Sequence, residues 1–193
     1  GARGCHRRAA DRALGGLVMD RSVKQHGWFV RVDDRLLHGQ VALNWISHLR
    51  PGRVAVVDET LAAQPQLWTL LEASLPANVE LWVGGVSDVG RLLGNEVPAP
   101  GTTLVLVASI GGAAAIHEAG LRYATLNLGM LARSEGRVRV GRQLWLSRGE
   151  LAELRRLADV GVWVSAQALP NDPPLPLEKI VCRIESVSSP RSA

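Results

Sequence analysis

The chain is poor in the residues that build disulfide-rich or metal-binding domains, and it lacks any long apolar run. Only two of its 193 residues are cysteines, Cys5 and Cys182, near opposite ends. Their spacing suggests neither a metal-binding motif nor a disulfide framework, and a reducing cytosol fits this usage. No apolar stretch approaches the roughly 20 residues needed to cross a bilayer. We therefore expect a globular protein of the cytoplasm that is not embedded in a membrane.

The excess of basic residues is confined to the start of the chain. Residues 1–27 carry six basic and two acidic side chains, and this excess of four equals the net charge of +4 of the whole chain. The remainder is therefore balanced, unlike the folded surface of a nucleic-acid binder, and we expect no nucleic-acid partner. We interpret residues 1–27 as a disordered basic leader. Residues 1–18 fit a cloning remnant or an over-extended start, with a functional basic arm as the alternative.

Short apolar segments alternate with helical patterns along the rest of the chain. The expected strands cover residues 28–32, 53–57, 80–83, 103–107, 123–127 and 162–166. The expected helices cover residues 40–49, 65–74, 86–93, 112–119 and 148–158. This alternation predicts an α/β fold with an open, mostly parallel, doubly wound sheet and helices on both faces. We expect one domain over residues 28–185, followed by a frayed polar tail over 186–193.

Local signals add two details. Ser147 and Glu150 have the spacing of a capping box at the start of the last expected helix. Residues 133–146 are expected to form an additional hairpin that turns at Ser134, Glu135 and Gly136.

Polar residues and glycines follow several of the expected strands. Ligands of doubly wound sheets bind beyond the carboxyl ends of the strands. The residues at those ends are Asp33, Asp34, Arg35, Asp58, Gly84, Gly85, Ser109 and Asn127. We expect them to converge on one edge of the sheet.

The loop after the first strand is the richest in reactive groups. His38 immediately precedes Gly39 and Gln40, where a helix is expected to begin. Free amides and the positive end of the helix dipole favour an anion there, and Arg35 offers a planar donor for phosphate oxygens. Either aspartate of the loop could hold Arg35 or orient the histidine ring. These features favour a phosphoryl-accepting histidine, with a purely structural salt-bridge turn as the alternative.

The same loop resembles a known motif. VRVDDRLLHGQV is similar to the active-site motif of the IIB components of the mannose/fructose/sorbose family of the bacterial phosphoenolpyruvate-dependent sugar phosphotransferase system. The match runs from Arg31 to Val41 without a gap. The likeness extends over roughly residues 28–180 and includes RVAVVDE (53–59), LNLG (126–129) and LPNDP (169–173).

The resemblance implies a phosphoryl carrier, a protein-phosphohistidine–sugar phosphotransferase. His38 would take a phosphoryl group from a IIA protein and pass it to a sugar that arrives through the membrane components IIC and IID, with Arg35 as a catalytic residue and no metal or other cofactor. The residues expected to contact the phosphoryl group or a partner are Asp33, Asp34, Gly39, Gln40, Asp58, Asn127 and Gly129. The family fold has one antiparallel strand in its sheet. The sugar, the oligomeric state (a homo-oligomer included) and peripheral association with the permease stay open.

Some features keep other interpretations open. After the fourth expected strand the family's Asn-Pro stretch is replaced by residues 108–112, and LNLG lacks the family's second glycine. These departures leave room for a phospho-accepting regulatory domain that passes nothing to sugar. A nucleotide binder is disfavoured because no Walker or dinucleotide glycine pattern is present. His48 and His117 are expected to be ordinary surface residues, and Arg133, Arg137, Arg139 and Arg142 a solvated strand face or a docking patch for an acidic IIA surface.

Overall fold

A computed structural model describes residues 27–94 and 102–188. The expectations for the leader, residues 1–18 included, and for the last residues of the tail lie outside these ranges, apart from Gly27. Among the described residues, no helix is both long enough and apolar enough to cross a membrane.

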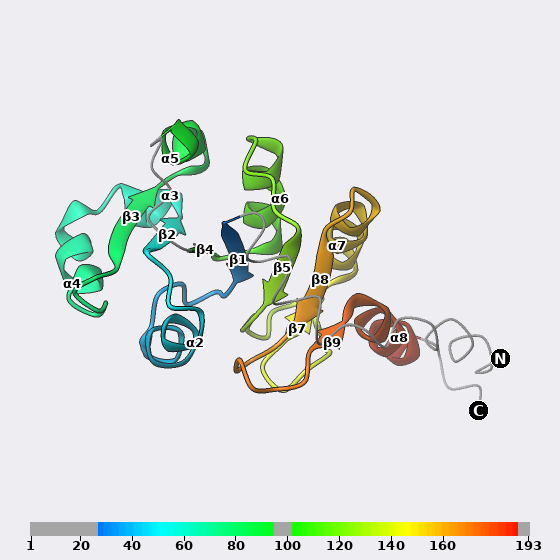
Figure 1. Ribbon diagram of the computed structural model, residues 1–193. Coiled ribbons are helices and arrows are strands. Elements are labelled where there is room, and N and C mark those ends of the chain that lie inside the picture. Colours follow the sequence, from blue (N-terminus) through cyan, green and yellow to red (C-terminus); the bar gives the residue numbers. More distant parts are fainter. Residues whose placement is uncertain (1–26, 95–101, 189–193) are drawn as a thin grey trace, which may run out of the picture.

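A single seven-stranded sheet forms the centre of the molecule, with strand order β3-β2-β4-β1-β5-β8-β9 (Figure 1). The strands are β1 (Trp28–Val32), β2 (Arg53–Val57), β3 (Glu80–Gly84), β4 (Thr103–Val107), β5 (Thr125–Leu128), β8 (Trp163–Ala166) and β9 (Leu175–Pro176). Neighbouring strands are parallel except β8 and β9, which are antiparallel. The predicted fold class is confirmed: an open, mostly parallel sheet with one antiparallel strand.

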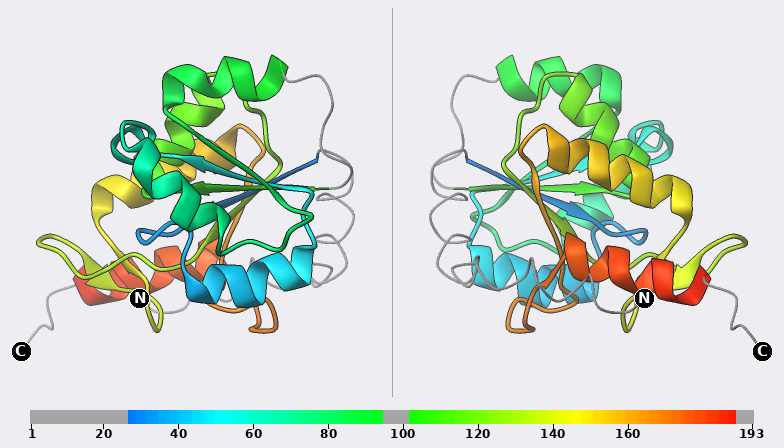
Figure 2. Two further views of the ribbon diagram at one scale, coloured as in Figure 1. Left: turned by 90° about the vertical axis from the view of Figure 1, so that its left-hand side faces the viewer. Right: turned by 90° about the vertical axis from the view of Figure 1, so that its right-hand side faces the viewer.

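Helices cover both faces of the sheet. They are η1 (Val41–Ile46), α2 (Ser47–Leu49), α3 (Glu59–Ala62), η2 (Pro65–Leu67), α4 (Trp68–Glu72), η3 (Val86–Asp88), α5 (Val89–Gly94), α6 (Ile110–Glu118), α7 (Arg148–Asp159) and α8 (Leu177–Ser188). Figure 2 shows α5, α6 and α7 on one side of the sheet and α2 and α8 on the other. Each face therefore buries its own apolar layer.

The core contains two apolar clusters. One contains Val30 and Val32 of β1 with apolar residues of α5, α6, α7 and α8. The other contains Phe29 of β1 with Val41 and Trp45 of η1. The helix after β1 and the helix after β4 thus lie on opposite faces, although β1 and β4 are neighbours. This divergence marks the topological switch point of the sheet at the carboxyl ends of β1 and β4, where doubly wound proteins bind ligands.

Several expected elements differ in detail. The helix expected over 40–49 is helical from residue 39, but its central part, η1, is a π-helix. The helix expected over 65–74 is split into η2 and α4, and it is preceded by α3, which the sequence did not predict. Breaks of this kind reflect tertiary packing, which local propensity does not encode. The capping box of α7 is confirmed, since Ser147 Oγ accepts from Glu150 N and the Glu150 carboxylate accepts from Ser147 N.

The hairpin exists, but its turn was misplaced. Strands β6 (Val138–Arg139) and β7 (Trp145–Leu146) pair antiparallel, and the chain reverses over residues 140–144, where Val140 N donates to Leu144 O at 2.9 Å. Gly136 does adopt a turn conformation with φ 75°, but this turn precedes the hairpin. Arg137 is not solvated as expected, because its guanidinium pairs with Glu150 of α7.

The C-terminal part was the least predictable from sequence. Neither β9 nor α8 was expected, and α8 continues to Ser188, beyond the expected domain end at residue 185. Cys182 of α8 is disulfide-bonded, which contradicts the expectation that the cysteines form no disulfide.

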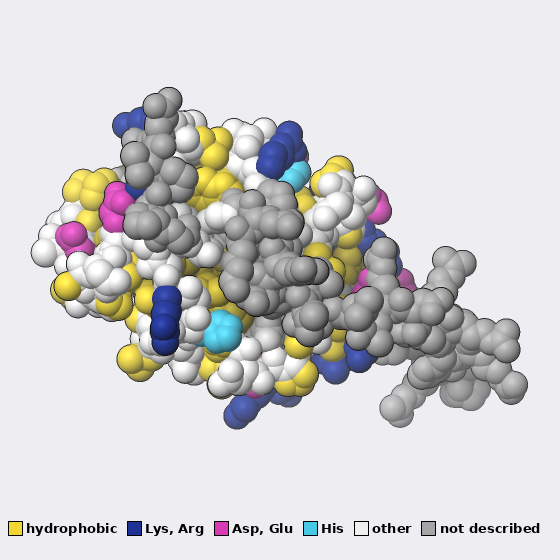
Figure 3. Space-filling view, viewed as in Figure 1, with side chains coloured by type: hydrophobic (Ala, Val, Ile, Leu, Met, Phe, Trp, Pro, Cys, Tyr) yellow, Lys and Arg dark blue, Asp and Glu magenta, His cyan; other side chains and the backbone are white. Residues whose placement is uncertain are grey.

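The exposed surface carries isolated apolar side chains. Leu67 and Leu70, beside and within α4, are exposed, and Figure 3 shows hydrophobic side chains at the left of the molecule, over that region. Leu43 of η1 is 75% exposed, the largest value among the exposed apolar residues described, and lies five residues after His38.

Candidate functional site

The loop after β1 is held in a strained turn. Leu36 N donates to Asp33 O at 2.9 Å, and Leu36 has a left-handed backbone with φ 51°, which costs a non-glycine residue about 1–2 kcal/mol. Leu36 and the buried Leu37 pack against the cluster beneath η1, and this burial offsets the strain. Strain of this kind is typical of functional sites. The turn places His38 between the carboxyl end of β1 and the helix that begins at residue 39.

His38 is oriented by a buried carboxylate. Its Nε2 lies 3.2 Å from Asp33 Oδ1, and the two side chains are 11% and 1% exposed. A carboxylate only accepts hydrogen bonds, so Nε2 is the donor in this contact, and in the neutral imidazole the lone pair is then on Nδ1. The expectation that an aspartate of this loop orients the ring agrees with this contact.

A helix begins directly after His38. Ala42 N donates to His38 O at 2.9 Å, so the amides of the residues between them have no acceptor within the helix. Gly39 and Gln40 are exposed, and a Cβ on Gly39 would meet no atom within 4 Å. An anion can therefore reach the free amides and the positive end of the helix dipole.

Arg31 is the principal residue that sequence reasoning left without a role. It is 3% exposed, and its guanidinium donates to Asp33 Oδ2 at 2.9 Å, to Gln167 O at 3.0 Å and to Asn127 Oδ1. It also lies 4.7 Å from the centroid of the Trp45 ring. A charged residue inside an otherwise apolar strand was the available signal, since such a residue is rarely buried without partners.

Asn127 and Gly129 support this arginine instead of facing solvent. Asn127 is 2% exposed and pairs in register with Arg31 across β1 and β5. A Cβ on Gly129 would lie 2.1 Å from Arg31 Nη2 and 2.6 Å from Asp33 Oδ2, so only glycine leaves room for the ion pair. Both residues therefore contact the charged pair behind the loop. Neither lies on the open edge, where a direct partner contact was expected.

The other charged residues of the loop point elsewhere. Asp34 Oδ2 accepts from Ala132 N at 2.7 Å, which ties the loop to the segment after β5. Arg35 is exposed, and within the part of the chain that the structure describes no residue pairs with its guanidinium. Of the two roles expected for the aspartates, Asp33 contacts the histidine ring, and neither carboxylate pairs with the Arg35 guanidinium. Arg35 is free to bind an incoming anion.

Asp58 is separated from this group. It caps α3, its Oδ1 accepting from Leu61 N at 2.8 Å. It follows β2, which is separated from β1 by β4, or about 10 Å at the usual strand spacing. Ser109 is nearer, since it follows β4, and it caps α6 by accepting from Gly112 N at 3.0 Å.

A second turn lies beside the loop. Gln167 is 6% exposed, and its side-chain amide donates to Pro170 O at 3.2 Å and Asp172 O at 2.7 Å. Trp45 Nε1 donates to Ala168 O at 3.1 Å. The turn is thus fixed both to the sheet and to the helix that follows His38. It contains the LPNDP segment, and Leu169 is 38% exposed.

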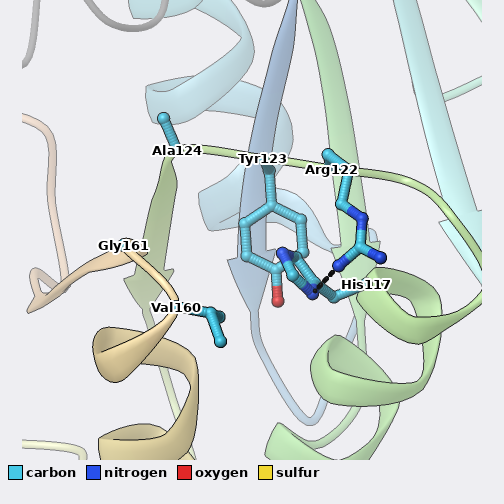
Figure 4. Close-up of a pocket in the computed structure, with 6 residues that line it drawn as sticks. All are labelled: His117, Arg122, Tyr123, Ala124, Val160 and Gly161. Carbon is cyan, nitrogen blue, oxygen red and sulfur yellow. Dashed lines mark hydrogen bonds between the residues drawn. The ribbon is translucent and has the colours of Figure 1, made fainter.

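Some of the described residues line a cavity at the other end of the sheet, where the strands begin. It measures about 290 Å³ and is lined by His117, Arg122, Tyr123, Ala124, Val160 and Gly161 (Figure 4). These residues precede β5 and β8, so the cavity lies at the amino ends of the strands, away from His38. The expectation that His117 is a surface residue is wrong, because it is 8% exposed. Arg122 lies 3.0 Å from its Nδ1, and burial, followed by the Arg122 charge, lowers its pKa.

Comparisons with known proteins show which family this chain is similar to. The model of the family described as "PTS system sorbose subfamily IIB component" matches residues 28–192. The mannose-specific EIIAB component of Escherichia coli is 26% identical over 155 residues, which are 80% of this chain and 48% of that protein. The fructose-specific EIIB component of Bacillus subtilis is 25% identical over 142 residues, 74% of this chain and 87% of that protein. The chain thus spans about half the length of the mannose-specific relatives.

Solved structures share the fold. The crystal structure of manxB from Thermoanaerobacter tengcongensis superposes with a TM-score of 0.74 at 26% identity, over 82% of this chain and 98% of that one. The IIBSor domain of the sorbose permease from Klebsiella pneumoniae superposes with a TM-score of 0.72 at 22% identity, over 80% of this chain and 95% of that one. The second likeness bears on the fold alone.

Proposed function

Because this chain belongs to the sorbose-subfamily IIB components of the phosphotransferase system, we propose that it is a phosphoryl carrier that accepts phosphate on His38 and passes it to a sugar during uptake. The observation that carries the proposal is the contact between His38 Nε2 and Asp33 Oδ1 at 3.2 Å. It assigns the ring proton to Nε2 and leaves Nδ1 as the nucleophile. No other described histidine combines such a contact with the start of a helix.

The proposed transfer follows from these groups. Nδ1 of His38 attacks the phosphorus of a phosphohistidine on the donor; the new N–P bond forms as the donor's N–P bond breaks, and the bonding electron pair stays on the donor nitrogen. Positive charge develops on the His38 ring, and the Asp33 carboxylate stabilises it through the Nε2 proton. Arg35 and the free amides at the helix start neutralise the phosphoryl oxygens. In the second transfer a sugar hydroxyl oxygen forms a bond to phosphorus as the bond between His38 Nδ1 and phosphorus breaks; the electron pair returns to Nδ1, which takes up the hydroxyl proton.

The partners follow from the family. We infer that the donor is a IIA protein and that the acceptor sugar reaches the site through the membrane components IIC and IID. The protein then works in the cytoplasm, at the inner surface of the permease. Arg35 and Gly39 of the exposed edge contact the phosphoryl group, while Asp33, Asn127 and Gly129 act from behind it.

The proposal is tested by phosphorylation with the general phosphotransferase proteins and phospho-IIA. The wild-type chain should take up acid-labile phosphate, and His38→Ala should take up none. His48→Ala is the matched control, because His48 is an exposed histidine on the same helical segment, and it should label normally. Persistent labelling of His38→Ala would refute the assignment.

A further inference from the structure

Arg31 connects the centre of the sheet to the proposed phosphoryl acceptor. Its guanidinium touches four different elements of structure: Asp33 in the loop, Asn127 on β5, the Gln167 carbonyl after β8, and the Trp45 ring on η1. Burial lowers the pKa of this guanidinium, and the Asp33 charge opposes that effect. An arginine fixed on so many sides cannot move without disturbing the sheet.

Asp33 links Arg31 to the histidine, because its carboxylate contacts both side chains. Its Oδ2 is held by Arg31 at 2.9 Å and faces Met130 N at 3.4 Å. Its other oxygen, Oδ1, lies 3.2 Å from His38 Nε2 and also accepts from Arg35 N at 3.4 Å. The carboxylate is therefore shared: one oxygen faces the Arg31 guanidinium, and the other faces the imidazole and the loop backbone. Fixing Oδ2 sets both the direction of Oδ1 and the negative charge that His38 experiences.

We propose that Arg31 is a positioning residue for phosphoryl transfer, which holds Asp33 so that the proton of His38 stays on Nε2 and Nδ1 stays unprotonated. This inference rests on the proposed function of His38. Without the Arg31 charge, the Asp33 carboxylate pairs more strongly with a doubly protonated imidazolium, which has no lone pair to attack phosphorus. Loss of the in-plane hydrogen bonds also lets the carboxylate rotate.

The other charges near His38 do not replace Arg31. Arg35 is exposed and unpaired within the described ranges, so solvent screens it. The Asp34 carboxylate is engaged by Ala132 N. In the neighbouring turn the Asp172 carboxylate accepts from Leu169 N at 2.9 Å. Arg31 is thus the buried cation in contact with the Asp33 carboxylate.

The test compares Arg31→Met and Arg31→Lys with the wild-type chain. The matched control is Arg53→Met, because Arg53, like Arg31, is a buried strand arginine with a carboxylate partner, Glu80, at 2.8 Å. Arg53 is the first residue of β2, whereas His38 follows the carboxyl end of β1. Two quantities are measured: the rate of phosphate transfer from phospho-IIA between pH 6 and 9, and the protonation of each ring nitrogen of His38 by ¹⁵N NMR without any partner.

Arg31→Met should transfer about 10²-fold more slowly at neutral pH, the size of effect expected of a small misplacement. Its rate should recover as the pH rises, and its His38 ring should remain doubly protonated to higher pH than in the wild type. Arg31→Lys keeps the charge without the planar contacts, so it should restore the pH profile in part. Arg53→Met should leave both the profile and the ring unchanged.

The outcomes are separable. If Arg31→Met and Arg31→Lys both fold and both keep the wild-type pH profile and His38 ring protonation, the proposal is overturned. A transfer rate that is lowered by the same factor at every pH would also overturn it. If Arg31→Met fails to fold, Arg31→Lys decides alone, and a wild-type rate in that variant counts against the proposal. If the wild-type chain takes no phosphate, the proposed function fails, while the ring protonation still tests the role of Arg31.

Discussion

At the scale of single residues, Arg35 is expected to contribute to phosphate transfer but not to the stability of the fold. Its guanidinium is exposed and has no partner in the described ranges, so Arg35→Ala removes no folded-state contact. We expect phosphate transfer to slow by about 10²-fold, roughly 2.7 kcal/mol of transition-state stabilisation, with the melting temperature nearly unchanged. Arg148→Ala, an exposed arginine on α7, serves as the control. Unfolding of Arg35→Ala without a separate kinetic defect would support the structural salt-bridge interpretation.

Gly129 and Gly39 are expected to differ in how well they tolerate an added Cβ atom. A Cβ on Gly129 would overlap the Arg31 guanidinium at 2.1 Å, whereas a Cβ on Gly39 meets nothing within 4 Å. We expect Gly129→Ala to lower the free energy of unfolding by about 1–3 kcal/mol, the usual cost of overpacking. Gly39→Ala should leave it nearly unchanged. Chemical denaturation of both variants measures the difference, and equal stabilities would contradict the described contact.

At the scale of elements, the start of α7 gives the clearest prediction. Ser147 Oγ accepts from Glu150 N at 3.2 Å, and Glu150 Oε2 accepts from Ser147 N at 2.8 Å. Ser147→Ala should cost about 1 kcal/mol, which lowers the melting temperature by roughly 2–4 °C for a domain of this size. Ser147→Thr keeps the acceptor and should lose much less. Phosphate transfer should change little in both, since among the described residues no hydrogen bond joins Ser147 to His38, Asp33 or Arg35, and the link to the loop runs through Glu150, Arg137 and Ala132.

The elements also show where sequence patterns succeed and where they fail. The strands up to β4 begin where expected, because their apolar runs are short and bounded by breaks. The π-helix η1 was not predicted; it contains Trp45, which contacts Ala168 and Arg31, and such distant contacts leave no trace in a local pattern. The hairpin turn was predicted at the wrong position, because Gly136 lies in a turn that precedes β6 and does not connect the two strands.

At the scale of the whole molecule, one buried and one partly buried titratable group, His117 and Glu150, predict a loss of stability in acid. Burial, and then the Arg122 charge, lowers the pKa of His117 below its ordinary 6.5. The unfolded chain therefore binds this proton more readily, and stability falls as the pH drops below about 6.5. Burial raises the pKa of Glu150, but hydrogen bonds from Arg137 and Ser147 outweigh it, and the net pKa lies below the ordinary 4.5. A second loss therefore begins as the pH falls below about 4.5.

Thermal unfolding measured from pH 8 to pH 3 checks this prediction. His117→Gln keeps an acceptor near Arg122 but does not titrate, so it should flatten the first decline and leave the second. Glu150→Gln should flatten the second decline and leave the first. A melting temperature that stays constant between pH 7 and pH 5 in the wild type would contradict the role given to His117.

The sequence by itself determined the fold class, the loop that carries the site and the family. Alternating apolar segments specify a parallel sheet through local periodicity, and the motif from Arg31 to Val41 is contiguous, so neither needs distant contacts to be recognised. Only the tertiary structure decided which groups meet. Asp33 pairs with Arg31 and His38 instead of Arg35. Arg31 also contacts Asn127 and Gln167, which lie 96 and 136 residues away from it in sequence. Such pairings depend on strand order and register, which bring distant residues together in a way that no local pattern encodes.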